Sequence, residues 1–135
     1  EPSEYEVMRT NAIAKKNRAT QTRLEKVLSY TKQTMVAYMS EEDLNRLCAY
    51  IVEYSSGDTI QKISPVKVDS QLKSIDIMHF GWNIGKAFSK KRIHTATFIK
   101  NVFAHTLRDL EISTIERKMS HTESACYIKL KKEIT

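Results

Sequence analysis

Cationic side chains are concentrated in the last fifty residues, and their types and spacing suit contact with an anionic molecule. Residues 86–135 contain 11 Lys or Arg against 5 Asp or Glu, whereas residues 1–85 contain 11 of each, so the second segment carries the whole net charge of +6. Segregated charge of this kind bears on association rather than on fold. Nucleic acid is the expected partner of a small basic domain. The cations concerned are Lys90, Lys91, Arg92, Arg117, Lys118, Lys129 and Lys131.

Other chemistry finds little support in the residue spacing. The chain has four His and two Cys, but no C-x₂-C, H-x₃-H or H-E-x-x-H spacing, so we expect no metal and no cofactor. The histidines are interpreted as surface or capping residues. No nucleophile is paired with a base at a recognisable spacing, and no Gly-rich phosphate loop is present, so we expect a non-enzymatic protein. Phe80 and Trp82 lie in the most apolar stretch and are better interpreted as core than as base-stacking residues.

Composition predicts one mainly α-helical domain over residues 1–135. The chain has 3 Gly and 2 Pro in 135 residues, too few for a turn-rich β-sandwich or barrel. No apolar run approaches the length needed to span a bilayer, so no membrane contact is expected. Cys48 and Cys126 fit two reduced thiols in a reducing compartment, which favours the cytoplasm. Because the chain begins at Glu1, we expect it to be trimmed or part of a longer protein.

The N-terminal part, residues 1–57, is predicted to form helices. Residues 1–23 have helical propensity but too few apolar residues to anchor them. Ser40 is expected to cap a helix over residues 41–55 that ends at Ser56-Gly57. Before it runs a helical stripe that is either a docking or homodimer surface or part of the core, two interpretations that we weigh equally. The stripe consists of Leu24, Leu28, Met35 and Met39.

Residues 58–69 are predicted to be an extended linker with a short edge strand, because Pro65 excludes a helix interior. In residues 70–135, apolar spacing predicts helices over about 70–88 and 95–107. Ser113 and Glu116 have the spacing of a capping box, which predicts a short third helix beginning there. The alternation over residues 126–131 is typical of a half-buried strand. This strand could pair with residues 60–68 in a minor two-stranded sheet.

The order of elements over residues 70–132 resembles the helix-turn-helix superfamily of DNA-binding domains in its winged-helix form. The resemblance covers the C-terminal half alone and rests on element order. It departs from the common pattern in a longer connection between the second and third helices and in a single visible strand where a wing has a hairpin. The resemblance implies that the short helix enters the major groove of duplex DNA.

On this interpretation Ile115 and Met119 face the core, and the outward residues of the short helix read base edges. These outward residues are Thr114, Arg117, Lys118 and His121. Lys90, Lys91 and Arg92 in the preceding turn, with Lys129 and Lys131 on the strand, would bind phosphates. Two alternatives remain open: an ordinary solvated helix face, and a protein-interaction or scaffold domain whose basic face binds an acidic protein.

Overall fold

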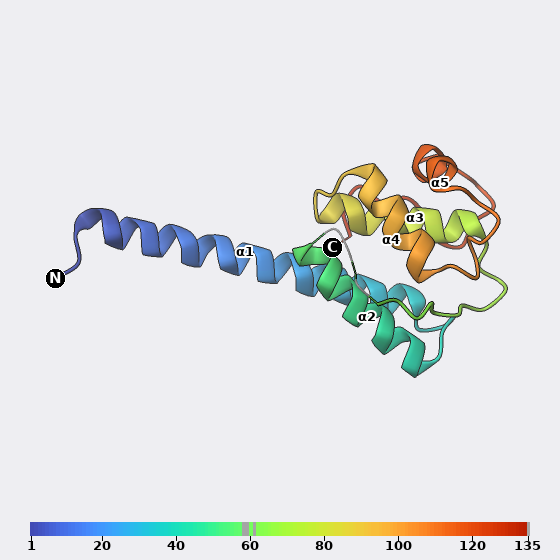
Figure 1. Ribbon diagram of the computed structural model, residues 1–135, viewed down its shortest axis with the longest axis horizontal. Helices are drawn as coiled ribbons and strands as arrows, with labels where there is room; N and C mark the ends of the chain where they lie inside the picture. Colours follow the sequence, from blue (N-terminus) through green and yellow to red (C-terminus); the bar gives the residue numbers. More distant parts are fainter. Residues whose placement is uncertain (58–59, 61, 135) are drawn as a thin grey trace.

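The protein is mainly helical, as predicted. The computed structural model describes residues 1–57, 60 and 62–134, and Figure 1 shows the order of the five helices in that part of the chain. They are α1 (Glu4–Met35), α2 (Glu41–Ser56), α3 (Ser74–Ala87), α4 (Arg92–Val102) and α5 (Ile112–Lys118).

Helix α1 belongs to the body only in its C-terminal third. Its first buried residue is Val27, and residues 1–23 are exposed apart from the half-buried Ala14. Residues 4–23 therefore project away from the other helices as a single helix, which we call the arm (Figure 1). A capping box begins it, in which the Ser3 hydroxyl accepts the Glu6 amide at 3.1 Å.

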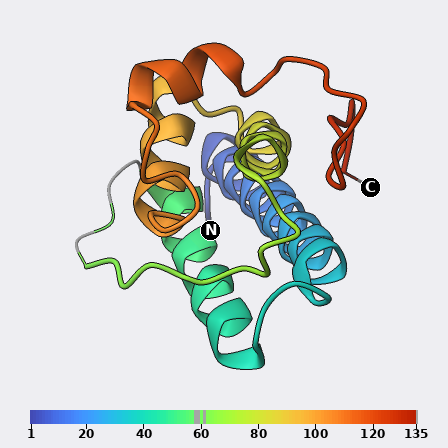
Figure 2. The same ribbon diagram turned by 90° about the vertical axis from the view of Figure 1, so that its right-hand side faces the viewer.

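Helix α2 packs beside the C-terminal part of α1, as the end-on view in Figure 2 shows. Ser40 caps it, since its hydroxyl accepts the Asp43 amide at 3.1 Å, so this predicted boundary is confirmed. The structure also describes the stripe of Leu24, Leu28, Met35 and Met39. Met35 is fully buried and the other three are partly buried against the core, which favours the core interpretation, while the docking interpretation stays a prediction.

Helix α3 forms the centre of the core. Phe80 is fully buried, stacked on Tyr30 of α1 at 5.8 Å between ring centroids and edge-on to Phe103 at 6.0 Å. Glycine allows α4 to cross closely, because a β-carbon on Gly85 would lie 2.3 Å from the Thr95 hydroxyl oxygen. The same helix thereby contacts both the N-terminal and the C-terminal part of the chain.

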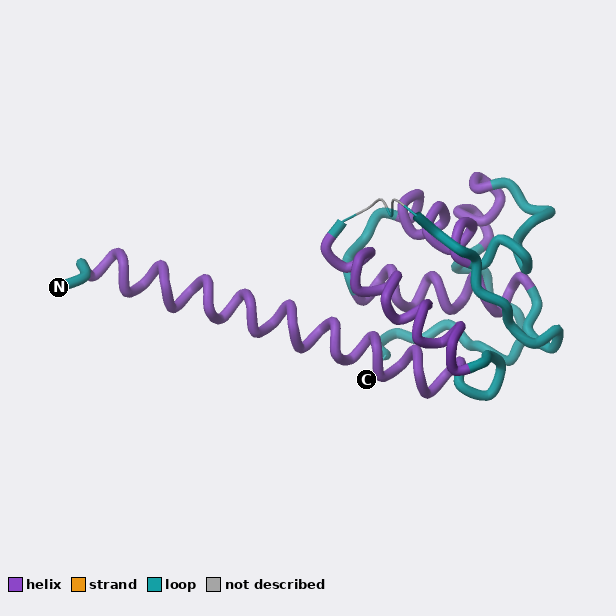
Figure 3. The backbone as a smooth tube through the Cα atoms, turned by 60° about the horizontal axis from the view of Figure 1, so that its bottom comes forward, coloured by secondary structure: helices purple, strands orange, loops and turns teal. Residues whose placement is uncertain are grey.

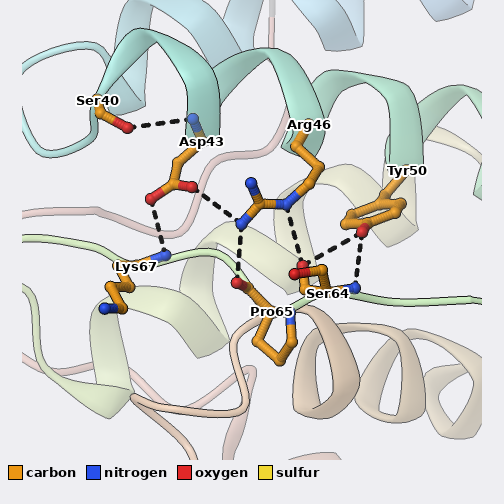
Figure 4. A network of polar contacts seen from close by, with 7 residues as sticks. All are labelled: Ser40, Asp43, Arg46, Tyr50, Ser64, Pro65 and Lys67. Atoms are coloured by element: carbon orange, nitrogen blue, oxygen red, sulfur yellow. Dashed lines mark hydrogen bonds and ion pairs between the residues drawn. The ribbon is translucent and has the colours of Figure 1, made fainter.

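Side chains of α2 hold the linker against the body (Figure 4). Arg46 donates to the carbonyl oxygens of Ser64 at 3.1 Å and Pro65 at 2.9 Å. The Tyr50 hydroxyl accepts the Ser64 amide at 2.8 Å, and an Asp43 carboxylate oxygen accepts the Lys67 amide at 3.2 Å. The linker is therefore extended, as predicted, but bonded to helix side chains. Residues 58, 59 and 61, which belong to the predicted linker, lie outside the described residues.

Three buried polar side chains of α3 hold the C-terminal tail in the same way, and we call them the α3 polar ladder. Asp76, His79 and Asn83 are each at most 2% exposed and are spaced so that they share one face of the helix. One Asp76 oxygen accepts the amides of Tyr127 at 2.6 Å and Ile128 at 3.0 Å. The ring nitrogens of His79 lie 2.8 Å from the Ile128 carbonyl oxygen and 2.7 Å from that of His121.

Asn83 completes the ladder and links it to α1. Its side-chain nitrogen donates to the Lys129 carbonyl and to the Tyr30 hydroxyl, both at 2.8 Å. Its side-chain oxygen accepts the Lys131 amide at 2.9 Å. One amide group therefore fixes the end of the tail against both α3 and α1.

The predicted two-stranded sheet is wrong for the part of the chain that the structure describes, which contains no strand (Figure 3). The backbone groups of residues 127–131 that would form a ladder with another strand are bonded to Asp76, His79 and Asn83. A segment outside helices and strands still needs partners for its buried N–H and C=O groups, and here helix side chains supply them.

Two smaller predictions are also corrected. Helix α5 begins at Ile112 with Glu111 as its N-cap residue and no side-chain cap, so Ser113 lies inside the first turn and forms no capping box. His79 was interpreted with the other histidines as a surface or capping residue, but it is 1% exposed and bonds the tail. For His79 the position is decided by tertiary contacts with the tail, which local sequence does not record.

We predict that Asn83→Leu loosens the end of the tail while α3 stays helical. The substitution leaves the Lys131 amide without its acceptor, and losing such a partner costs about 1–3 kcal/mol. Native-state hydrogen exchange should therefore show the Lys131 amide exchanging roughly tenfold to a hundredfold faster. Asn101→Leu, at an exposed position of α4, is the matched control. Unchanged exchange at Lys131 in the Asn83 variant would contradict the assigned role.

Candidate nucleic-acid interface

Two cavities flank the C-terminal end of α3; five of the nine described residues that line the first are cations, as are three of the eight that line the second. The first, about 350 Å³, lies between α1, α3 and the tail. The second, about 270 Å³, lies between α3, α4 and the residue that follows α5. Lys86, in the last turn of α3, lines both of them. Together they form one surface, which we call the basic surface, and its cations are Arg23, Lys26, Lys86, Lys90, Arg92, Lys131 and Lys132.

Four cations of this surface have no ion-pair partner among the described residues. Among the described residues that line the two cavities, Glu133 is the one carboxylate. Within the described residues, no carboxylate forms an ion pair with Arg23, Lys26, Lys86 or Lys132. Cations held near one another without counter-charges repel, and a bound anion relieves that repulsion. The surface is therefore suited to phosphate groups.

Separate parts of the fold bring these cations together. Arg23 and Lys26 lie one turn apart where α1 enters the body, and Lys86 ends α3. The α3 polar ladder positions the tail so that Lys131 and Lys132 line the first cavity beside them. A cation in the last turn of a helix also complements the helix dipole.

Two predicted phosphate-binding residues also have structural roles. The Arg92 guanidinium lies 5.0 Å from the Trp82 ring centroid and donates to the Glu116 carbonyl and, at 3.1 Å, to the Ser120 hydroxyl. Arg92 thus holds the end of α5 against α3 and α4. Lys90 donates to the Gly57 carbonyl at 3.1 Å and lies 5.2 Å from the Tyr54 ring centroid, so it joins α2 to the turn before α4.

The orientation predicted for α5 agrees with its burial. Ile115 is fully buried and Met119 is 1% exposed. Arg117, Lys118 and His121 are exposed, and Thr114 is half-buried. Arg117 and Lys118 directly precede Met119, which lines the second cavity, so the last turn of α5 adjoins the basic surface.

The remaining predicted residues divide between the basic surface and other positions. Lys91 is exposed at the N-cap of α4. Lys129 is exposed and donates to the Ser124 carbonyl at 3.2 Å, outside both cavities. Lys131 lines the first cavity with its ammonium 5.6 Å from the Tyr30 ring centroid.

Sequence reasoning missed Arg23, Lys26, Lys86 and Lys132. Arg23 and Lys26 lie in residues 1–85, where cationic and acidic residues are equal in number. A comparison of net charge between the two segments therefore does not reveal them. A local signal was present, because residues 9–23 contain five Lys or Arg and no Asp or Glu. Their meeting with the tail depends on tertiary packing and leaves no pattern in the sequence.

Two titratable groups near the interfaces of α1 have shifted pKa values. Burial raises the pKa of the Tyr30 phenol, and this effect outweighs the hydrogen bonds with Asn83 and Thr34 that lower it. Tyr30 therefore remains a neutral partner for Asn83. Burial likewise raises the pKa of the Cys48 thiol, with the nearby Lys32 charge acting in the opposite direction. Cys48 and Cys126 are both free thiols.

Neither a metal centre nor a membrane span is found in the residues described. No group of three or more His, Cys, Asp or Glu side chains among them is arranged to hold a metal ion. None of the described helices has the length and apolar character needed to cross a membrane.

Comparison of the chain with protein-family models, curated proteins and solved structures found no match. Function must therefore be inferred from the side chains of the site itself.

Proposed function

We propose that this protein is a non-enzymatic DNA-binding module, with a regulatory role in transcription or in a mobile element, and that the basic surface binds the phosphates of duplex DNA. The observation that carries the proposal is the meeting of cations from α1, α3, α4 and the tail at the end of α3, where Glu133 is the one carboxylate among the described lining residues. Phosphate contacts supply most of the affinity in non-specific DNA binding.

In this proposal α5 reads sequence beside the basic surface. Its exposed Arg117 can form two hydrogen bonds with a guanine edge, and Lys118 can reach a base or a phosphate. Arg92 has a positioning role, because its bonds to Glu116 and Ser120 fix the end of α5 relative to the cavities. Phosphate binding would thus set the register in which α5 meets the groove.

A protein-interaction domain is the second candidate, and one observation favours it. The N-terminal half of the arm exposes four large apolar side chains: Tyr5, Val7, Met8 and Ile13. Exposed apolar residues gathered in one region are common at protein interfaces. An acidic protein bound to the basic surface would also account for the charge. This candidate requires that the protein bind a protein partner and show no dependence on duplex DNA.

The DNA-binding proposal predicts that Lys86→Gln/Lys132→Gln weakens binding to a labelled random-sequence duplex. Fluorescence anisotropy at about 50 and 200 mM salt should show wild-type binding at the lower salt and a steep loss at the higher salt. Each lost phosphate contact lowers the slope of log K against log salt by about 0.9, so the double variant should have a slope about two units shallower.

Lys62→Gln/Lys67→Gln removes the same charge from exposed positions of the linker and is the matched control. It should bind the duplex almost as wild type does. If the control loses as much affinity as the Lys86/Lys132 variant, binding follows net charge and not this surface. If wild-type protein does not bind at the lower salt, the proposal is wrong.

A second prediction concerns α5. Charge reversal, Arg117→Glu/Lys118→Glu, should abolish duplex binding and leave thermal unfolding nearly unchanged, because exposed substitutions shift stability by about 0.5 kcal/mol or less. Circular dichroism on heating checks the fold, and anisotropy checks binding. Retained duplex affinity would remove α5 from the interface, and early unfolding would show that these side chains support the core.

A further inference from the structure

The arm packs against no other element in the part of the chain that the structure describes. From Glu4 to Arg23 it runs for 20 residues, about 30 Å at 1.5 Å per residue, and nearly every side chain on it is exposed. A polar helix of this length gains little stability by itself in water. A partner that covers one face of the arm would supply the missing stabilisation.

One face of the arm continues the basic surface outward. Arg23, which lines the first cavity, lies seven residues from Lys16 and fourteen from Arg9. A seven-residue step turns an α-helix by only about 20° from a full two turns and advances it about 10.5 Å. These three cations therefore form a row that points to the same side as the cavity. We call this row the arm stripe.

Small residues separate the cations of the arm stripe. Ala12 lies between Arg9 and Lys16, and Ala19 lies between Lys16 and Arg23, in each case at helical spacing. All five side chains are exposed. Alanine leaves room for a bulky partner to approach the helix axis, while the long cationic side chains reach outward on either side.

Charge decides which partner fits this face. A second copy of the arm would place like charges along the seam at positions where a coiled coil requires apolar residues. The large apolar residues do not repair this, since Tyr5 and Met8 share a face only at the tip of the arm, before the arm stripe begins, and Val7 lies on the opposite side of the helix. Residues 9–23 carry five cations and no carboxylate, which complements a regularly spaced polyanion.

We infer that the arm stripe is a second contact surface for the same DNA duplex, with Arg9, Lys16 and Arg23 bound to phosphates as the arm lies along or in a groove. The inference rests on the proposed function of the basic surface and extends its footprint by the length of the arm. A helix fits the major groove of B-DNA. The arm thereby gains the partner that the protein itself does not provide.

The test uses the full chain and a duplex of about 30 base pairs, which is long enough to reach both surfaces. Arg9→Gln/Lys16→Gln changes the outer arm stripe and leaves Arg23 and both cavities intact. Anisotropy should show a salt slope about two units shallower than that of wild type and an affinity roughly tenfold lower or more at about 50 mM salt. Circular dichroism checks that the helix content is retained.

The matched control is Arg18→Gln/Lys67→Gln, which removes one Arg and one Lys from exposed positions off the arm stripe. Wild-type affinity and slope in the Arg9/Lys16 variant, or an equal loss in the control, would overturn the inference while leaving the basic surface in place. Wild-type protein that fails to bind the duplex would overturn both proposals. Sedimentation of the free protein as a dimer that the Arg9/Lys16 variant alters would assign the arm to a second copy instead.

Discussion

The structure depends on three polar side chains buried along the central helix. Asp76, His79 and Asn83 replace the strand that an extended C-terminal tail would otherwise require, because they accept and donate the hydrogen bonds of its backbone. Burying such groups is costly unless their bonding capacity is met. The ring nitrogens of His79 lie within hydrogen-bond distance of two carbonyl oxygens. The tail therefore has one position, fixed by specific polar contacts and by the burial of Ile128.

That constraint leads directly to the site. With the tail fixed, Lys131 and Lys132 lie beside Arg23 and Lys86, which come from helices far away in the sequence. The bond between Asn83 and Tyr30 also joins the ladder to α1, the helix whose N-terminal part forms the arm. Arg92 joins α5 to α3 in a similar way, because it donates to the Glu116 carbonyl of α5 and lies over the Trp82 ring of α3. The basic surface, and the arm and α5 that are proposed to extend it, are thus all joined to α3.

Local signals predicted the elements well, and tertiary contacts account for the errors. The Ser40 cap and the burial of Ile115 and Met119 follow from spacing alone, and both are confirmed. The alternation of residues 126–131 correctly places Ile128 inside, but the segment bends at residues 127 and 128 and forms no strand, and periodicity does not say that helix side chains will bond it. The polar residues Asp76, His79 and Asn83 within the mostly apolar α3 were the signal that helix side chains would bond the tail. For the site, Lys90, Arg92 and Lys131 were found from charge clustering, whereas Arg23 and Lys86 required the fold.

Chemical-shift mapping tests the central claim most directly, because it locates the bound duplex on the protein without substitutions. In a titration of ¹⁵N-labelled protein with a short duplex at low salt, the proposal predicts that the largest changes fall on the backbone amides of Arg23, Lys26, Lys86 and Lys132. Amides of the linker around Lys67, which lies near Asp43 of α2 and outside both cavities, should stay unchanged. Changes confined to α2 and the linker, or no changes at all, would contradict the assignment of the basic surface as a DNA-binding site.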